Sequence, residues 1–124
     1  MSKLEKTLVY DFDKLLAFIE EGVVNTSTTA TLEESTDFQS GNSRCSVRVF
    51  ERYSLTGSNR LSLSVTLFQS GGGPIYLSAI TSGGAETVFF SYNTFGEIKF
   101  LDKFMEILCS DPQISNQLVD SSEI

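Results

Sequence analysis

Arginine is the residue type in this chain whose spacing could do chemistry. All four arginines lie between positions 44 and 60, and every lysine lies outside that stretch. Arg44, Arg48, Arg52 and Arg60 occupy even positions of a segment in which apolar and polar residues alternate. Side chains of a strand alternate between its two faces, so this parity predicts that all four share one face of a sheet. A guanidinium binds carboxylates and phosphates through a planar fork, so the cluster indicates a site for an anion or an acidic partner.

A plainer interpretation is a solvated sheet face whose arginines pair with acidic residues such as Glu33. Arg44 and Arg52 would lie about 26 Å apart along an extended strand, too far to hold one small anion together. Charged residues on the exposed face of a strand are also ordinary.

Large apolar side chains are expected on the same face as the arginines. Contiguous apolar patches usually mark the site of a partner or a ligand, because a solvated face has no need of them. We therefore expect a partner to cover this face, most simply a second copy of the chain, since homodimers are the commonest oligomers. The expected contact residues are Arg48, Phe50, Arg52, Phe68, Tyr76 and Phe89, with Ile80 beside them.

The chain shows no recognisable catalytic or metal-binding pattern. It has no histidine, which removes the commonest general base and the commonest transition-metal ligand. The glycines at 71–73 lead into a strand segment and lack the lysine of a phosphate loop. Cys45, expected to face the core, and Cys109 are expected to be inert thiols. The sequence thus favours a non-enzymatic protein and predicts no catalytic residue, metal or cofactor.

Composition and charge exclude other classes of partner. A net charge of −7 argues against nucleic acid, since binding to phosphates depends on clustered basic residues. No apolar run approaches the ~20 residues that a membrane-spanning helix needs. The first residues lack the apolar stretch of a signal peptide, and two cysteines fit a reducing compartment. We expect a cytoplasmic protein that binds neither nucleic acid nor membrane.

The elements that position the arginines follow from the alternation. It predicts strands over residues 44–54, 60–68, 75–81 and 86–92, with odd residues of the first three turned to the core. Pairing Ser54 with Arg60 would match odd with odd residues across the first turn. A two-residue turn at Gly83-Gly84 would then switch the parity for the last strand. The apolar odd residues of this segment are Cys45, Val47, Val49, Leu61, Leu63, Val65, Leu67, Ile75, Leu77 and Ala79.

Helices are predicted on either side of these strands. Asp11 can cap a helix whose apolar positions are Phe12, Leu15, Leu16, Ile19 and Val23, with Gly22 near its end. The pair Thr94 and Glu97 is typical of a capping box at the start of a second helix. Its apolar stripe would consist of Ile98, Leu101, Phe104, Met105 and Leu108.

The remaining segments complete an α+β fold. Residues 26–31 resemble a first strand with Ala30 and Leu32 turned inward, and residues 37–43 resemble a loop. We therefore expect one domain over residues 1–112, an antiparallel meander of about five strands with both helices on one face, in the order α-β-β-β-β-β-α. Residues 113–124 are polar and acidic, and we expect a flexible tail.

A second class of function stays open at this point. The C-terminal helix could leave a cavity against the curved sheet, and the chain would then be a small-molecule-binding protein or an enzyme. Glu51, Tyr53, Phe90 and Tyr92 would line that cavity.

Three strings carry a family resemblance: Arg44-Cys-Ser-Val-Arg-Val-Phe-Glu-Arg-Tyr-Ser54, Asn59-Arg-Leu-Ser-Leu-Ser-Val-Thr-Leu-Phe68 and Leu77-Ser-Ala-Ile-Thr-Ser-Gly-Gly84. Together they make the chain similar to a family of small bacterial proteins known only as a domain of unknown function. The resemblance covers most of the chain and implies a bacterial, cytoplasmic protein. It brings no catalytic residues to carry over.

Overall fold

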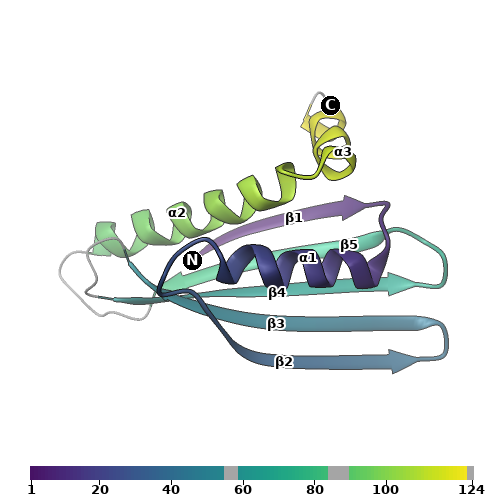
Figure 1. Ribbon diagram of the computed structural model, residues 1–124, viewed down its shortest axis with the longest axis horizontal. Coiled ribbons are helices and arrows are strands. Elements are labelled where there is room, and N and C mark those ends of the chain that lie inside the picture. Colours follow the sequence, from purple (N-terminus) through teal and green to yellow (C-terminus); the bar gives the residue numbers. More distant parts are fainter. Residues whose placement is uncertain (55–58, 84–89, 123–124) are drawn as a thin grey trace.

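The chain forms a five-stranded antiparallel sheet with helices packed against one side (Figure 1). This computed structural model describes residues 1–54, 59–83 and 90–122. The α+β class is therefore confirmed. The elements in chain order are β1 (Ser2–Leu8), α1 (Phe12–Val24), β2 (Thr31–Ser40), β3 (Ser43–Tyr53), β4 (Arg60–Ser70), β5 (Ile75–Gly83), α2 (Phe90–Cys109) and α3 (Pro112–Ser122).

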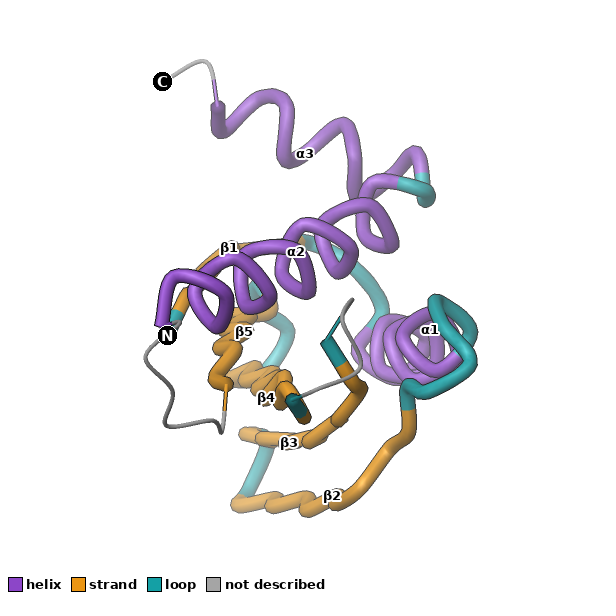
Figure 2. The backbone as a smooth tube through the Cα atoms, turned by 90° about the vertical axis from the view of Figure 1, so that its left-hand side faces the viewer, coloured by secondary structure: helices purple, strands orange, loops and turns teal. Residues whose placement is uncertain are grey.

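The sheet has the order β1-β5-β4-β3-β2, so four consecutive strands form a meander and β1 joins at the far edge. Figure 2 shows α1 and α2 on the same side of the strands. We call this side of the sheet the helix face. No described element covers the other side, which we call the open face. The core between helices and sheet holds the buried side chains Leu8, Phe12, Leu15, Ile19, Val23, Phe50, Leu61, Leu63, Val65, Leu67, Ile75, Leu77, Ala79, Phe100, Phe104, Leu108, Ile114 and Leu118.

Helix α1 begins as the sequence predicts. The carboxylate of Asp11 accepts a hydrogen bond from the backbone N–H of Lys14 at 2.9 Å, which satisfies a free amide of the first turn. Gly22 does not end the helix, which continues to Val24. Its role is close packing, because a Cβ at this position would lie 2.5 Å from Cγ2 of Ile107 on α2.

The edge strand β2 differs from its predicted bounds. It covers residues 31–40, whereas the sequence suggested a strand over 26–31 and a loop over 37–43. Only the turn between β2 and β3 remains of that loop, where Gly41 adopts a φ of 58°. The polar composition of this strand is explained by its exposure, since all ten of its residues are exposed.

The fifth strand comes from the N-terminus, which is a correction to the predicted order. β1 pairs with β5, placing Leu4 beside Ala79 and Leu8 beside Ile75. The predicted strand over 86–92 is wrong at residues 90–92, which begin α2, and its other residues, with the predicted turn at Gly83-Gly84, reach into positions 84–89 outside the described ranges. Leu4 and Leu8 lie on one face of β1, and Lys3, Glu5 and Thr7 on the other, but Lys6 interrupts the apolar face and leaves only a weak signal in the sequence.

Helix α2 starts earlier than the predicted capping box. Glu97 lies inside the helix and is buried, and its carboxylate accepts from the backbone N–H of Gly83 at 2.8 Å. It also lies 2.7 Å from the N-terminal ammonium. The predicted stripe is right for Phe104 and Leu108, whereas Ile98 is 44% exposed and Phe100 takes a core position.

The predicted flexible tail is instead helix α3. Ile114 and Leu118 are buried in the core, which gives this polar segment an apolar anchor. The Gln117 side chain accepts from and donates to the backbone of Val9. Tyr10 donates to Asp111 at 2.6 Å, and this hydrogen bond raises the pKa of Tyr10 and lowers the pKa of Asp111.

Candidate functional site

The side chains of β3 face opposite to the predicted direction. Tyr53, not Ser54, pairs with Arg60, so Arg52 lies opposite Leu61 and Arg48 opposite Val65. A shift of one residue in register turns every side chain of a strand over. The even residues of β3 therefore lie on the helix face together with the odd residues of β4 and β5.

This register divides the predicted contact set. Arg48, Phe50 and Arg52 lie on the helix face and are buried, so they cannot form a surface with the others. Phe68 and Tyr76 lie on the open face, 40% and 53% exposed. Phe89 lies outside the described residues.

Arg48 is a fully satisfied structural arginine. Its Nε donates to Glu20 of α1 at 2.6 Å, and Nη1 lies 3.0 Å from the Asp37 carboxylate of β2. Further hydrogen bonds from Nη1 reach the carbonyl oxygens of Thr36 and Val47. The hydroxyl of Ser46 and the guanidinium of Arg48 both donate to Asp37, and they lower the pKa of that carboxyl.

Two other arginines are paired as well. Arg44 lies 2.8 Å from the Asp13 carboxylate, and its guanidinium stands 3.9 Å from the ring centroid of Phe12. Arg60 is on the open face, contrary to the prediction that the four arginines share one face. It pairs there with Glu51 and, at 3.5 Å, with Glu33.

Arg52 differs from all three. It is only 7% exposed, yet no carboxylate of the described residues forms an ion pair with it, and its Nε has no hydrogen-bond partner there. Its guanidinium carbon lies 4.4 Å from the ring centroid of Phe100. Burial without a partner lowers the pKa of Arg52. The side chain lines a cavity of about 310 Å³ together with Lys99, Asp102, Lys103 and Glu106 of α2.

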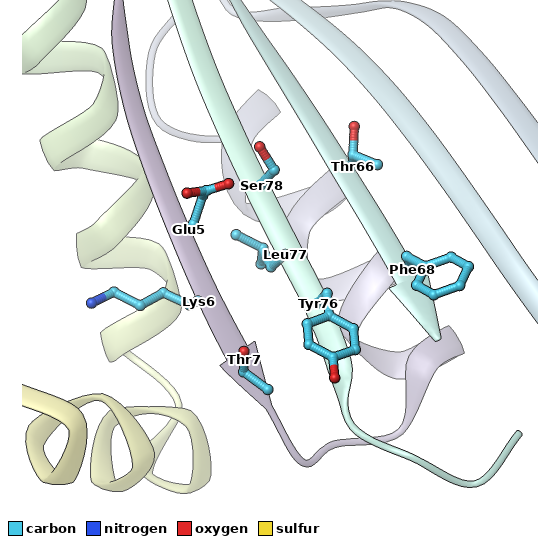
Figure 3. A pocket seen from close by; sticks show the side chains of 8 residues that line it. All are labelled: Glu5, Lys6, Thr7, Thr66, Phe68, Tyr76, Leu77 and Ser78. Atoms are coloured by element: carbon cyan, nitrogen blue, oxygen red, sulfur yellow. The ribbon is translucent and has the colours of Figure 1, made fainter. Parts of the chain in front are cut away.

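The open face holds the second candidate site. Residues in register form a row across all five strands, and Phe68 and Tyr76 stand at its centre with ring centroids 6.4 Å apart. Beside this pair is a hollow of about 380 Å³. Figure 3 shows its lining: the rings of Phe68 and Tyr76 at one end, and small hydroxyl side chains of β4 and β5 at the other. The lining residues are Glu5, Lys6, Thr7, Thr66, Phe68, Tyr76, Leu77 and Ser78.

A comparison with known families places the chain. Residues 1–110 match a family described as a family of unknown function (DUF6054). The chain belongs to DUF6054. The match covers every element from β1 to α2 and confirms the resemblance to an uncharacterised family. No curated protein and no solved structure matches this DUF6054 chain significantly.

The alternative cavity does not form from its predicted lining in this DUF6054 member. Glu51 and Tyr53 lie on the open face, away from α2, and Glu51 pairs with Arg60. Phe90 and Tyr92 belong to the first turn of α2, and their side chains lie outside what the structure describes. A cavity does lie between α2 and the sheet, but its sheet residue is Arg52.

The described parts of the DUF6054 chain contain neither a cluster of metal-binding side chains nor a membrane-spanning helix. Within residues 1–54, 59–83 and 90–122, no group of three or more acidic or cysteine residues is placed to hold a metal ion. None of the helices in these ranges is long and apolar enough to cross a membrane. Cys45 and Cys109 are free thiols, and Cys45 lies on the open face, not in the core as predicted.

Proposed function

We propose that this DUF6054 member is a non-enzymatic binding module that associates with a second copy of itself through the open face. The observation that carries the proposal is the gathering of large exposed apolar side chains on that face. Phe38, Tyr53, Phe68, Tyr76 and Ile80 are between 38% and 66% exposed, and all five belong to the open face. Patches of this kind usually mark an interaction site.

Three of these side chains, Phe38, Phe68 and Tyr76, lie in one row across the sheet. Phe38 of β2 lies opposite Cys45, Cys45 opposite Phe68, Phe68 opposite Tyr76, and Tyr76 opposite Thr7 of β1. The row thus runs from one edge of the sheet to the other. Two such rows stacked face to face would bury aromatic rings on both copies, as in a β-sandwich.

Charge on the two edges favours a second copy as the occupant. The row through Val49, Ser64 and Ile80 ends in Glu34 on β2 and in Lys3 on β1, so its two end residues carry opposite charges, and Lys3 also lies 3.5 Å from Glu5 of the same strand. A two-fold axis parallel to the strands and along β4 would place β1 of one copy over β2 of the other. Lys3 would then face Glu34 of the second copy, and the aromatic rows would overlie each other. Such self-complementarity is the requirement of a two-fold interface.

The size of the face is sufficient. Strands about 4.8 Å apart with a rise of about 3.3 Å per residue give a five-stranded face of roughly 700 Å². A standard protein interface buries about 800 Å² on each partner. The open face of one copy therefore matches what a stable dimer needs.

A cytoplasmic, bacterial setting belongs to the same proposal. Both described cysteines are free, as is usual in a reducing compartment.

Sedimentation equilibrium tests the dimer. The wild type should sediment as a dimer, and Phe68→Ser with Tyr76→Ser should sediment as a monomer with unchanged circular dichroism. Ile98→Ser is the matched control, because Ile98 is 44% exposed on α2, away from the open face. If the wild-type protein stays monomeric at high concentration, the proposed self-association is wrong.

A charge exchange tests the geometry of the axis. Lys3→Glu should weaken the dimer by placing like charges over Glu34, and adding Glu34→Lys should restore it. If the double variant is no stronger than Lys3→Glu alone, the two edges do not face each other as proposed.

A further inference from the structure

The unpaired guanidinium of Arg52 is the feature that the self-association does not use. It lies on the helix face, whereas the proposed dimer forms through the open face. Arginine is almost never fully buried unless it is paired, because burying an uncompensated charge is costly. At 7% exposure Arg52 is as buried as Arg48, which has two carboxylate partners.

A bulge in β2 explains why the sheet supplies no partner. The register shifts between Leu32 and Glu34, which leaves Glu33 out of the ladder. With a regular ladder Glu33 would lie opposite Phe50, on the same face as Arg52. Instead its carboxylate reaches Arg60 on the open face at 3.5 Å. β-Bulges often re-aim a side chain in this way next to functional sites.

The space beside Arg52 can hold a small ligand. The cavity of about 310 Å³ is at the lower end of the range that small-molecule sites occupy. Arg52 of β3 lines the cavity, and its guanidinium stands over the ring of Phe100 of α2. An aromatic face leaves the edge of the guanidinium, where its N–H donors point, available for an acceptor.

The charges around the cavity favour a monoanion over a dianion. Lys103 lies 3.6 Å from Glu106, so these two lining charges offset each other. The guanidinium of Arg52 is the buried cation of the lining, and Asp102 and Glu106 place two carboxylates on the wall along α2. These two carboxylates repel a dianion such as phosphate more strongly than they repel a monoanion.

We infer that the cavity between β3 and α2 binds a small organic monocarboxylate, whose carboxylate accepts hydrogen bonds from the guanidinium of Arg52. A guanidinium and a carboxylate match in shape and form charge-assisted bonds. The carboxylate of the ligand would pair with Arg52 in place of Glu33, which the bulge turns to the other face. The organic part of the ligand would occupy the space along α2.

NMR titration of the ¹⁵N-labelled full chain tests this inference. Acetate and benzoate are added at constant ionic strength, with chloride as the reference anion and inorganic phosphate as a competing class. The Nε–Hε signal of Arg52, assigned by its loss in Arg52→Gln, should shift saturably with the carboxylates. Arg52→Gln should weaken carboxylate binding by about tenfold or more, since a charged hydrogen bond is lost.

Arg44→Gln is the matched control, because Arg44 lies on the same strand and face and also stands over a phenyl ring. It should leave the carboxylate affinity unchanged. Absence of a saturable shift at Arg52, or equal affinity in Arg52→Gln, would overturn the site. Tighter binding of phosphate than of either carboxylate would overturn the ligand class.

If Arg52→Gln does not fold, Arg52→Lys replaces it, because lysine keeps the positive charge and loses the planar pair of donors. The sedimentation state is read separately, so the dimer and the ligand site can fail independently.

Discussion

Arg48 and Arg52 lie on the same face of the same strand and are equally buried, but their surroundings differ completely. Arg48 meets carboxylates from α1 and β2. Arg52 meets one aromatic ring from α2 and has no ion-pair partner within the described ranges. The charge of Arg48 is thus balanced by carboxylates of neighbouring elements, whereas the charge of Arg52 has no such balance among the described residues. Arg48 therefore joins β3 to α1 and β2, and Arg52 has hydrogen-bond donors left for the proposed ligand.

The difference comes from the neighbouring elements. Glu20 lies on α1, which packs over β2 and β3, and Asp37 lies opposite Ser46 on the helix face of β2. Nearer the end of β3, α2 replaces α1 as the cover and contributes Phe100. The β2 bulge turns Glu33 to the open face at that level. Two local events therefore decide which arginine is paired.

The largest effect is expected from Arg48→Met. This change removes the charged hydrogen bonds that join β3 to α1 and β2, so it should lower the free energy of unfolding by about 2–3 kcal/mol. Urea unfolding followed by circular dichroism measures the loss. Arg44→Met is the control, since its partner Asp13 is 75% exposed, and we expect a loss of about 1 kcal/mol or less. Equal losses in the two variants would contradict a special structural role for Arg48.

Arg52→Met should behave in the opposite way. Replacing a buried charge that has no ion-pair partner among the described residues with an apolar side chain of similar length is often neutral or stabilising. We expect the free energy of unfolding to stay within about 1 kcal/mol of the wild type, on the stable side. The same urea experiment measures it. A loss as large as that of Arg48→Met would show that Arg52 serves the fold.

The sequence was sufficient for the elements with strong local signals. The Asp11 cap and the spacing of Leu15, Ile19 and Val23 predict α1 correctly, because both signals act within one helix. The alternation in β4 and β5 predicts their buried faces, and the turn between them matches odd with odd residues, with Leu67 opposite Leu77. Local chemistry therefore determined most of the fold class.

Register across the β3–β4 turn could not be predicted in the same way. Both faces of β3 carry apolar residues, Val47 and Val49 on one and Phe50 on the other, so alternation alone does not choose the core side. The choice depends on Glu20 and Asp37, which come from distant parts of the chain and receive Arg48. The candidate cavity was missed for this reason, since Arg52 was placed on the opposite face.

A carboxylate placed beside Arg52 should make its surroundings resemble those of Arg48. Lys99→Glu puts an acid on the wall of the cavity. We expect it to abolish the carboxylate-induced shift of the Arg52 signal, because the added carboxylate repels the ligand. Lys14→Glu, on α1 outside this cavity, controls for the change in net charge. Undiminished carboxylate binding in Lys99→Glu would show that the ligand does not sit between Arg52 and α2.

The smallest effect separates the two arginines by pH. The pKa of Asp37 lies below its ordinary value of 3.8, because Ser46 and Arg48 donate to the carboxylate. A carboxyl with a lowered pKa in the folded state stabilises the fold above the ordinary value, and that contribution disappears as the pH falls through the folded pKa. The stability of the wild type should therefore exceed that of Asp37→Asn at neutral pH, and the difference should vanish in acid.

Arg52→Met provides the contrast. Its guanidinium forms no ion pair with a carboxylate of the described residues, so the variant should keep the wild-type slope of stability against pH between about pH 5 and pH 2. The effect of Asp37→Asn should be small, since its side chain is 59% exposed and water screens the pair. Urea unfolding at a series of pH values measures both slopes. A shallower acid slope in Arg52→Met would reveal a carboxylate coupled to Arg52, and the two arginines would then differ in degree only.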